Sequence, residues 1–131
     1  MVRRSIVIEV PWTPCQKCNP NTSTVSERTR KRYRQQGADQ SAMPIRMAAR
    51  AGAAFAEPVR LDVTIYWGRY RKPWDTDNLW TAMKQLRDKL QTEGVVVNDN
   101  LIQTGEITQY RRNEHDRQEG MELTITETEA A

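Results

Sequence analysis

"VRLDVTIYW", residues 59 to 67, is the clearest secondary-structure signal in the chain. Its apolar residues alternate strictly with more polar ones, which is the period of a strand with one buried and one exposed face. A strand of this kind belongs to a sheet whose apolar face is covered by other elements. The strand runs through the basic segment "GRYRKP" into "WDTDN", residues 74 to 78. It therefore delivers the chain to a cluster of acidic and amide side chains.

That cluster opens an amphipathic helix, which we expect to run from Asn78 to Leu90. At about 100° per residue, four apolar side chains form one stripe that should face the sheet, namely Leu79, Met83, Leu86 and Leu90. Asp77, Lys84 and Asp88 share the polar side away from that stripe. Gly94 is expected to end the helix, because glycine adopts the left-handed conformation at little cost.

The segments before this region predict a further strand and two further helices. "SIVIEV", residues 5 to 10, is rich in β-branched residues and predicts a strand. Residues 11 to 24 are rich in proline and asparagine and predict an irregular loop. Ser26 is expected to cap an arginine-rich helix that ends at Gly37, and residues 45 to 55 predict a separate, alanine-rich helix.

After the aspartate helix, residues 101 to 112 predict a strand that faces residues 121 to 127 across a polar loop, as in a hairpin. The interleaved elements predict an α+β fold. We expect a two-layer α/β sandwich, with a mixed sheet of about four or five strands and two or three helices. The length favours a single domain over residues 1–131, with an acidic tail from about residue 127.

Charge is distributed unevenly along the 131 residues, although the formal net charge is only +3. Basic residues concentrate in one cluster over residues 28–34 and another over residues 69–72. Such clusters are typical of a polyanionic partner, and a merely solvated basic face is the alternative. With DNA as the partner, contacts to phosphates are expected from Arg28, Arg30, Lys31, Arg32, Arg34, Arg69, Arg71 and Lys72.

No stretch approaches the roughly 20 apolar residues of a membrane span, and the N-terminus lacks a signal-peptide cleavage pattern. We therefore expect a cytoplasmic protein without a membrane partner.

Cys15 and Cys18 are spaced as C-x-x-C in the predicted loop. Structural zinc takes four ligands, and the only histidine, His115, lies about a hundred residues away. Two incidental reduced thiols are thus favoured over zinc shared between two subunits and over a redox pair.

Asp75 and Asp77 have two explanations. They are helix-capping residues that interact with the helix dipole, or they are ligands of a hard divalent cation. The dipole gives a second exposed carboxylate only a few tenths of a kcal/mol, so capping does not explain the pair. Asp99 follows in the turn "NDN" and would come back beside the start of the helix if "VVV" (residues 95–97) runs back along it. Three carboxylates, Lys84 and the basic clusters would then form a metal-dependent phosphodiester site.

The segment "WDTDNLWTAMKQLRDKLQTEGVVVNDNLIQTGEI", residues 74 to 107, resembles the signature of the RusA-like Holliday junction resolvases. In that family an Asp-x-Asp-Asn opens a helix that carries a lysine, and a later turn carries an aspartate pair. The resemblance implies that Asp75, Asp77 and Asp99 bind the metal. It also implies that Lys84 is the catalytic lysine, or Thr81 at that place in the shorter-spaced form. Asn78, Asp88 and Asn98 are expected to support the site.

Two positions depart from the pattern of the family. Asn98 stands where the family often has the first aspartate of its pair, which leaves Asp99 as the ligand. In the N-terminal loop, either Asn19 or Asn21 corresponds to the asparagine of the family.

By this resemblance the chain is expected to be a homodimeric endodeoxyribonuclease that nicks four-way or other branched DNA symmetrically, with Mg²⁺ as cofactor and Mn²⁺ as a substitute. A two-fold dimer matches the symmetry of a junction. Two alternatives are a catalytically silent module that binds branched or single-stranded DNA, and another metal-dependent phosphohydrolase.

Among other residues, the tryptophans are expected to pack in the core, with a contact between two subunits as an alternative for Trp12, and His115 is expected to lie on the surface. Tyr33 and Tyr70 are expected either to stack on bases or to pack in the core.

Overall fold

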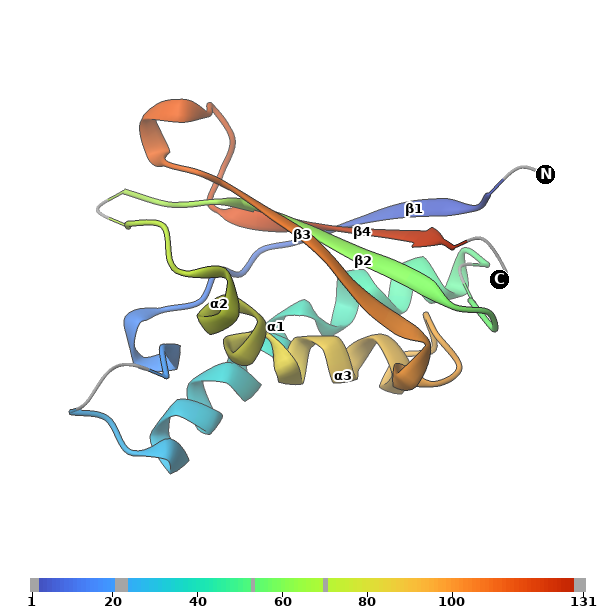
Figure 1. Ribbon diagram of the computed structural model, residues 1–131, viewed down its shortest axis with the longest axis horizontal. Coiled ribbons are helices and arrows are strands. Elements are labelled where there is room, and N and C mark those ends of the chain that lie inside the picture. Colours follow the sequence, from blue (N-terminus) through green and yellow to red (C-terminus); the bar gives the residue numbers. More distant parts are fainter. Residues whose placement is uncertain (1–2, 21–23, 53, 70, 129–131) are drawn as a thin grey trace.

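The computed structural model describes residues 3–20, 24–52, 54–69 and 71–128. A mixed four-stranded sheet forms one layer, and three α-helices cover one of its faces (Figure 1). The main elements are β1 (Ser5–Val10), α1 (Glu27–Arg50), β2 (Val59–Tyr66), α2 (Thr76–Ala82), α3 (Lys84–Thr92), β3 (Ile102–Tyr110) and β4 (Gly120–Glu127). Short 3₁₀ helices are η1 (Gln16–Cys18), η2 (Asp99–Leu101) and η3 (Arg112–Glu114). The predicted α+β class, strand count and helix count are confirmed.

The sheet has the order β1-β4-β2-β3, in which β2 and β3 are parallel and the other neighbours are antiparallel. The predicted hairpin between the last two strands is therefore wrong. β2 lies between β3 and β4, so the segment from Arg111 to Glu119 has to cross the end of β2. A direct hairpin usually needs only two to five loop residues, roughly half of what this polar segment supplies.

The core lies between the sheet and the helices. On β2, Val59, Leu61, Val63 and Ile65 all point into it, as the alternation predicts. Trp67 is fully buried directly after this strand, and Trp12 is buried as well, so both belong to the core. In the part of the chain that the structure describes, no helix covers the opposite face of the sheet (Figure 1). Within the described residues, no helix is both long and apolar enough to cross a membrane.

Helix α1 is one continuous helix of 24 residues, so the predicted break at Gly37 is wrong. Its predicted start is confirmed, because the Ser26 hydroxyl accepts a hydrogen bond from the Thr29 backbone N–H at 3.2 Å. Gly37 is buried, and a Cβ at this position would overlap the indole of Trp12. Glycine is therefore present to let a tryptophan approach the helix, and the helix continues through it despite the lower propensity of glycine.

We expect Gly37→Ala to destabilise the fold by about 1–3 kcal/mol, because the added methyl group overpacks the contact with Trp12. At an exposed helix position the same change would stabilise the protein by up to about 1 kcal/mol. Urea unfolding of the wild type, Gly37→Ala and the exposed neighbour Gln36→Ala measures the difference. A Gly37→Ala protein as stable as the Gln36→Ala control would contradict this role for Gly37.

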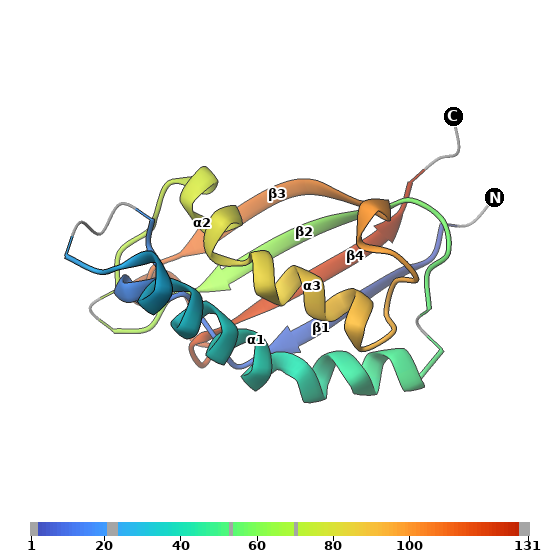
Figure 2. The same cartoon turned by 90° about the horizontal axis from the view of Figure 1, so that it is seen from below.

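The aspartate helix is also not what the sequence predicts, since it breaks into α2 and α3 at Met83 (Figure 2). Met83 has φ −97° and ψ 9°, which interrupts regular helix geometry. The predicted apolar stripe is nevertheless buried against the sheet on both helices. The predicted end is confirmed as well, because Gly94 has a φ of 88°. The break also means that Asp77 lies on α2, whereas Lys84 and Asp88 lie on α3, so the three residues do not share one continuous helix.

Candidate active site

Asp75 and Asp77 lie at the start of α2, where both side chains are exposed. Asp75 is the N-terminal flanking residue of the helix, yet its side chain makes no capping hydrogen bond. Asp77 contributes its backbone carbonyl, which accepts from the Thr81 hydroxyl at 3.0 Å. Among the described residues, neither carboxylate has an ion-pair partner. The fold thus uses the carboxylates for neither capping nor ion pairing, which leaves their oxygens available to a ligand.

Gln109 holds the backbone just before these aspartates. Its side-chain oxygen accepts from the Trp74 backbone N–H at 2.9 Å, and its amide nitrogen donates to the Trp74 carbonyl at 2.8 Å. The same oxygen accepts from the indole N–H of Trp67 at 2.9 Å. The two indoles also stack with their centroids 6.0 Å apart. The position of Asp75 is therefore fixed by a side chain from the end of β3.

A cavity of about 610 Å³ opens beside Asp75. Its lining residues are Gln16, Asn19, Arg69, Arg71, Lys72, Pro73, Trp74, Asp75 and Asn78. Three cations and three amides surround a single carboxylate, so the cavity suits an anionic group such as a phosphate. Of the two asparagines that the resemblance offers, Asn19 lies here, whereas Asn21 falls outside the described residues. Gln16 is a lining residue that the sequence did not single out.

Asp99 lies far from this cavity within one chain. Its backbone N–H donates to the Gln91 side chain at 2.8 Å, near the end of α3. The residue belongs to η2, directly before β3, and Ile102 at the start of β3 pairs with Val59 at the start of β2. Because β2 and β3 are parallel, Asp99 lies beside the start of β3 and Asp75 beside its end, and the 9 residues of this strand span roughly 26 Å at about 3.3 Å per residue. The expected return of Asp99 to the start of the helix is therefore wrong.

The supporting residues are also divided between the two ends. Asn98 uses its side-chain oxygen to accept from the Asn100 backbone N–H at 3.0 Å, so it caps η2. Asn78 lines the cavity, whereas Asp88 is exposed on α3 beyond the break at Met83. No group of three or more His, Cys, Asp or Glu side chains that could hold a metal occurs among the described residues of one chain.

Lys84 faces a separate basic groove between α1 and the α2–α3 segment. This groove consists of two adjoining depressions that share Lys31 and Gln85. Its remaining lining residues are Glu27, Arg28, Thr29, Arg32, Arg34, Gln35, Trp80, Thr81, Lys84 and Arg87. Lys84 and Thr81, the two candidates for the family's lysine, thus lie in one groove, and Asp75 lines the other cavity.

The basic residues of α1 have different environments. Arg28, Lys31 and Arg32 are exposed and line the groove, as expected for phosphate contacts. Arg30 pairs with Glu27 at 3.1 Å, and this hydrogen bond holds the pKa of the Glu27 carboxyl below its ordinary value. Tyr33, the predicted stacking residue on this helix, is half-buried and packs against the core, and Tyr70 lies outside the described residues.

Arg34, a predicted DNA contact, is only 4% exposed, although it contributes to the wall of the groove. Two of its guanidinium nitrogens donate to the Cys18 carbonyl, Nε at 3.1 Å and Nη2 at 2.9 Å. Arg34 therefore attaches the N-terminal loop to α1. A run of basic residues on an amphipathic helix places some of them on its buried side, where only the tertiary structure shows their partners.

We expect Arg34→Met to lower the free energy of unfolding by about 2 kcal/mol, because methionine fills the space but leaves the Cys18 carbonyl without its donor. Arg32→Met, at an exposed position two residues away, should change stability by no more than about 0.5 kcal/mol. Urea unfolding compares the two. Equal effects in the two variants would contradict the structural role of Arg34.

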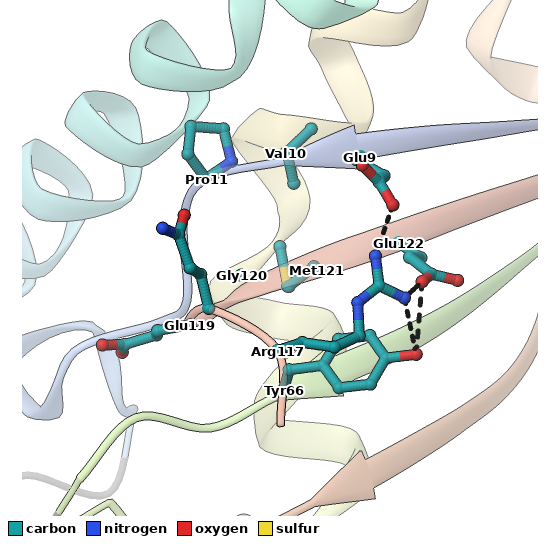
Figure 3. Close-up of a pocket in the computed structure, with 10 residues that line it drawn as sticks. Glu9, Val10, Pro11, Tyr66, Arg117, Glu119, Gly120, Met121 and Glu122 are labelled. Carbon is teal, nitrogen blue, oxygen red and sulfur yellow. Dashed lines mark hydrogen bonds and ion pairs between the residues drawn. The ribbon is translucent and has the colours of Figure 1, made fainter. Parts of the chain in front are cut away.

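A separate depression, of about 390 Å³, lies beside the start of β4 and the end of β1 (Figure 3). Among its described lining residues the only cation is Arg117, which forms ion pairs with Glu9 and Glu122 and lies over the ring of Tyr66 at 4.5 Å. This arginine already has its charge satisfied. The depression is therefore less suited to an anionic ligand than the cavity beside Asp75, which Arg69, Arg71 and Lys72 line.

His115 is not the plain surface residue that the sequence predicts. It is half-buried, and its Nε2 is 2.9 Å from the carbonyl oxygen of Trp67. Its ring also packs edge-on against Tyr66, with the centroids 5.2 Å apart. His115 therefore holds the crossing segment onto the end of β2.

Comparison with known proteins adds no assignment to this geometry. A scan against protein-family models gives no match to the chain, and a search of curated proteins finds no similar sequence.

Proposed function

We propose that the protein is a Mg²⁺-dependent endodeoxyribonuclease that selects branched DNA, including four-way junctions. The observation that carries this proposal is the pair Asp75 and Asp77, two exposed carboxylates without ion-pair partners among the described residues. Asp75 lines a cavity whose other charged lining residues are Arg69, Arg71 and Lys72, and Asp77 follows two residues later in the first turn of α2. Carboxylates for a hard cation next to cations for a phosphate form the combination that phosphodiester hydrolysis requires.

The side chains of the cavity have separate tasks in this proposal. Arg69, Arg71 and Lys72 bind the phosphate and orient it toward Asp75. Asp75 and Asp77 would hold Mg²⁺ through oxygen atoms, the ligands that this ion prefers, and Mn²⁺ would be accepted in its place. When bound, the ion would neutralise the negative charge that builds up on the phosphate during hydrolysis.

A second copy of the chain supplies the third carboxylate. Among the described residues, β3 pairs only with β2, so its other edge has no partner strand. Pairing of two β3 edges about a two-fold axis would be antiparallel, and the start of one β3 would then lie beside the end of the other. Asp99 of one copy would thereby approach Asp75 of the other. The separation of these residues within one chain thus favours a homodimer with two equivalent sites.

The basic groove extends the contact with DNA beyond the reacting phosphate. Lys31, Arg32 and Lys84 bind phosphates of a neighbouring stretch of backbone, which sets the register of the substrate. Lys84 is thereby reassigned from the reacting phosphate to this groove. Because the proposed substrate is cellular DNA, the proposal includes a cytoplasmic location in a bacterium or a phage-infected host.

The test compares nicking of a four-way junction, a matched linear duplex, a single strand and a nucleotide phosphate ester, each with and without Mg²⁺. We expect nicking of the junction only when Mg²⁺ or Mn²⁺ is present, and little on the duplex. Hydrolysis of the small ester in preference to DNA would contradict the proposal and support a different phosphohydrolase.

A DNA-binding module without cleavage is the second candidate. One observation favours it, since the described residues of a single chain hold no group of three metal ligands. Junction binding that is tight in EDTA, with no nicking at any Mg²⁺ concentration, would identify this module.

A further inference from the structure

The Cys15–Cys18 pair lies in a geometry close to that of a disulfide. The Cys18 backbone N–H donates to the Cys15 carbonyl at 2.9 Å, and this 3₁₀-type turn brings both side chains to the same side. Their Sγ atoms are 3.4 Å apart. A disulfide has a length of about 2.05 Å, so bond formation requires the sulfurs to approach by only about 1.4 Å.

The two thiols differ in exposure and anchoring. Cys15 is half-buried and reachable from solvent, whereas Cys18 is fully buried. The hydrogen bond between the two thiols and then burial raise the pKa of the Cys18 thiol far above its ordinary value, which disfavours its thiolate. Arg34 holds the Cys18 carbonyl in place. An oxidant therefore reaches the Cys15 sulfur first. Cys15, rather than the anchored Cys18, is the residue that can shift to bring the two sulfurs to bonding distance.

The same turn forms part of the wall of the cavity beside Asp75. Gln16 lies between the two cysteines and Asn19 follows the second, and both line the cavity. A bond across the turn would therefore restrain two of the three amides that face the cavity.

We propose that Cys15 and Cys18 are a modification site, a dithiol that a peroxide converts into an intramolecular disulfide which restrains this wall of the cavity. The Cys15 sulfur attacks a peroxide oxygen, the O–O bond breaks, and Cys15 becomes a sulfenic acid while water leaves. The Cys18 sulfur then attacks the Cys15 sulfur, the S–O bond breaks, and hydroxide leaves with the Cys18 proton as a second water. Two thiols are oxidised by two electrons in total, and one peroxide is reduced. Formation of the disulfide is independent of the proposed function, and only an effect on DNA cleavage rests on it.

The test treats the full chain with stoichiometric hydrogen peroxide and measures alkylatable thiols by mass spectrometry after denaturation. We expect loss of both thiols in a monomeric species on a non-reducing gel, full recovery with dithiothreitol, and a rise in Tm of about 5 °C. Cys18→Ser should stop at a Cys15 sulfenic acid that dimedone traps, and in Cys15→Ser the buried Cys18 should stay reduced. Disulfides only between chains, or two thiols still free in the wild type, would overturn the proposal.

Hydrogen exchange tests the restraint of the cavity wall without DNA. In the oxidised wild type, amides of residues 15–19 should exchange on the order of tenfold more slowly than in the reduced protein, and Cys15→Ser should show no such change. Unchanged exchange in a protein whose disulfide has formed would overturn the link between the dithiol and the cavity. Neither measurement depends on nuclease activity, so failure of the nuclease proposal would leave both results interpretable.

Discussion

Asp75→Asn should lower Mg²⁺-dependent junction nicking by on the order of a hundredfold to a thousandfold, with little change in folding. The carboxylate makes no capping bond, and among the described residues it has no ion pair, so the fold loses nothing when its charge is removed. The site loses an anionic oxygen ligand of Mg²⁺ and the charge neutralisation that the ion supplies. Single-turnover nicking of a labelled junction measures the rate, and thermal unfolding checks the fold.

Asp88→Asn is the matched control for this variant, because Asp88 is an exposed aspartate on α3 beyond the break at Met83. It should nick at a rate close to that of the wild type. Junction binding in EDTA should be unchanged or slightly tighter for Asp75→Asn, since a negative charge is removed beside Arg69, Arg71 and Lys72. Wild-type nicking by Asp75→Asn, or an equal loss in Asp88→Asn, would contradict the assignment of Asp75 to the metal.

Gln109→Leu should combine a large loss of stability with a large loss of activity. The change leaves the Trp67 indole N–H and both backbone groups of Trp74 without their partner, at a cost of about 3 kcal/mol. It also releases the backbone that positions Asp75, and a displacement of about 1 Å at a reacting centre lowers rates by on the order of a hundredfold. Urea unfolding and nicking at a temperature where the variant is folded measure the two effects.

Gln40→Leu, at an exposed position on α1 away from the cavity and from β3, should change stability by no more than about 0.5 kcal/mol and leave nicking unaffected. A folded Gln109→Leu protein that nicks like the wild type would show that Gln109 does not position the site.

Features of the fold that depend on local sequence were predictable. The alternation in β2 and the apolar stripe of the aspartate helix each identify a buried face, because side-chain direction follows from the period of the element. Ser26 and Gly94 mark helix ends through hydrogen bonding and backbone conformation within a few residues. These signals need no knowledge of the rest of the chain.

Features that depend on distant partners were not predictable. Gly37 is a usual helix terminator, yet its reason for being glycine is the indole of Trp12, 25 residues earlier in the sequence. In the sequence, Arg34 cannot be distinguished from its exposed basic neighbours, and only the structure shows that it donates to the Cys18 carbonyl. The position of Asp99 follows from the parallel pairing of β2 and β3, which the polar loop after β3 did not reveal.

The candidate site shows the same division. Asp75, Arg69, Arg71 and Lys72 are close in sequence and meet at one cavity, as the motif implies. Gln109 and Gln16 join them from other elements, and an isolated glutamine in a strand or loop carries no sequence signal of such a role. The third carboxylate, Asp99, and the lysine, Lys84, are parts of the motif that the single chain does not bring to the cavity.

Mixing two inactive variants tests most directly whether a second copy completes the site. A mixed dimer contains one Asp75→Asn chain and one Asp99→Asn chain. Because each site takes Asp75 from one copy and Asp99 from the other, one of its two sites carries both substitutions and the other site carries neither. We predict that each variant alone is inactive and that the mixture, after subunit exchange, regains about a quarter of the wild-type number of sites and nicks single strands of the junction. A mixture as inactive as its components, with exchange of subunits demonstrated, would contradict the account.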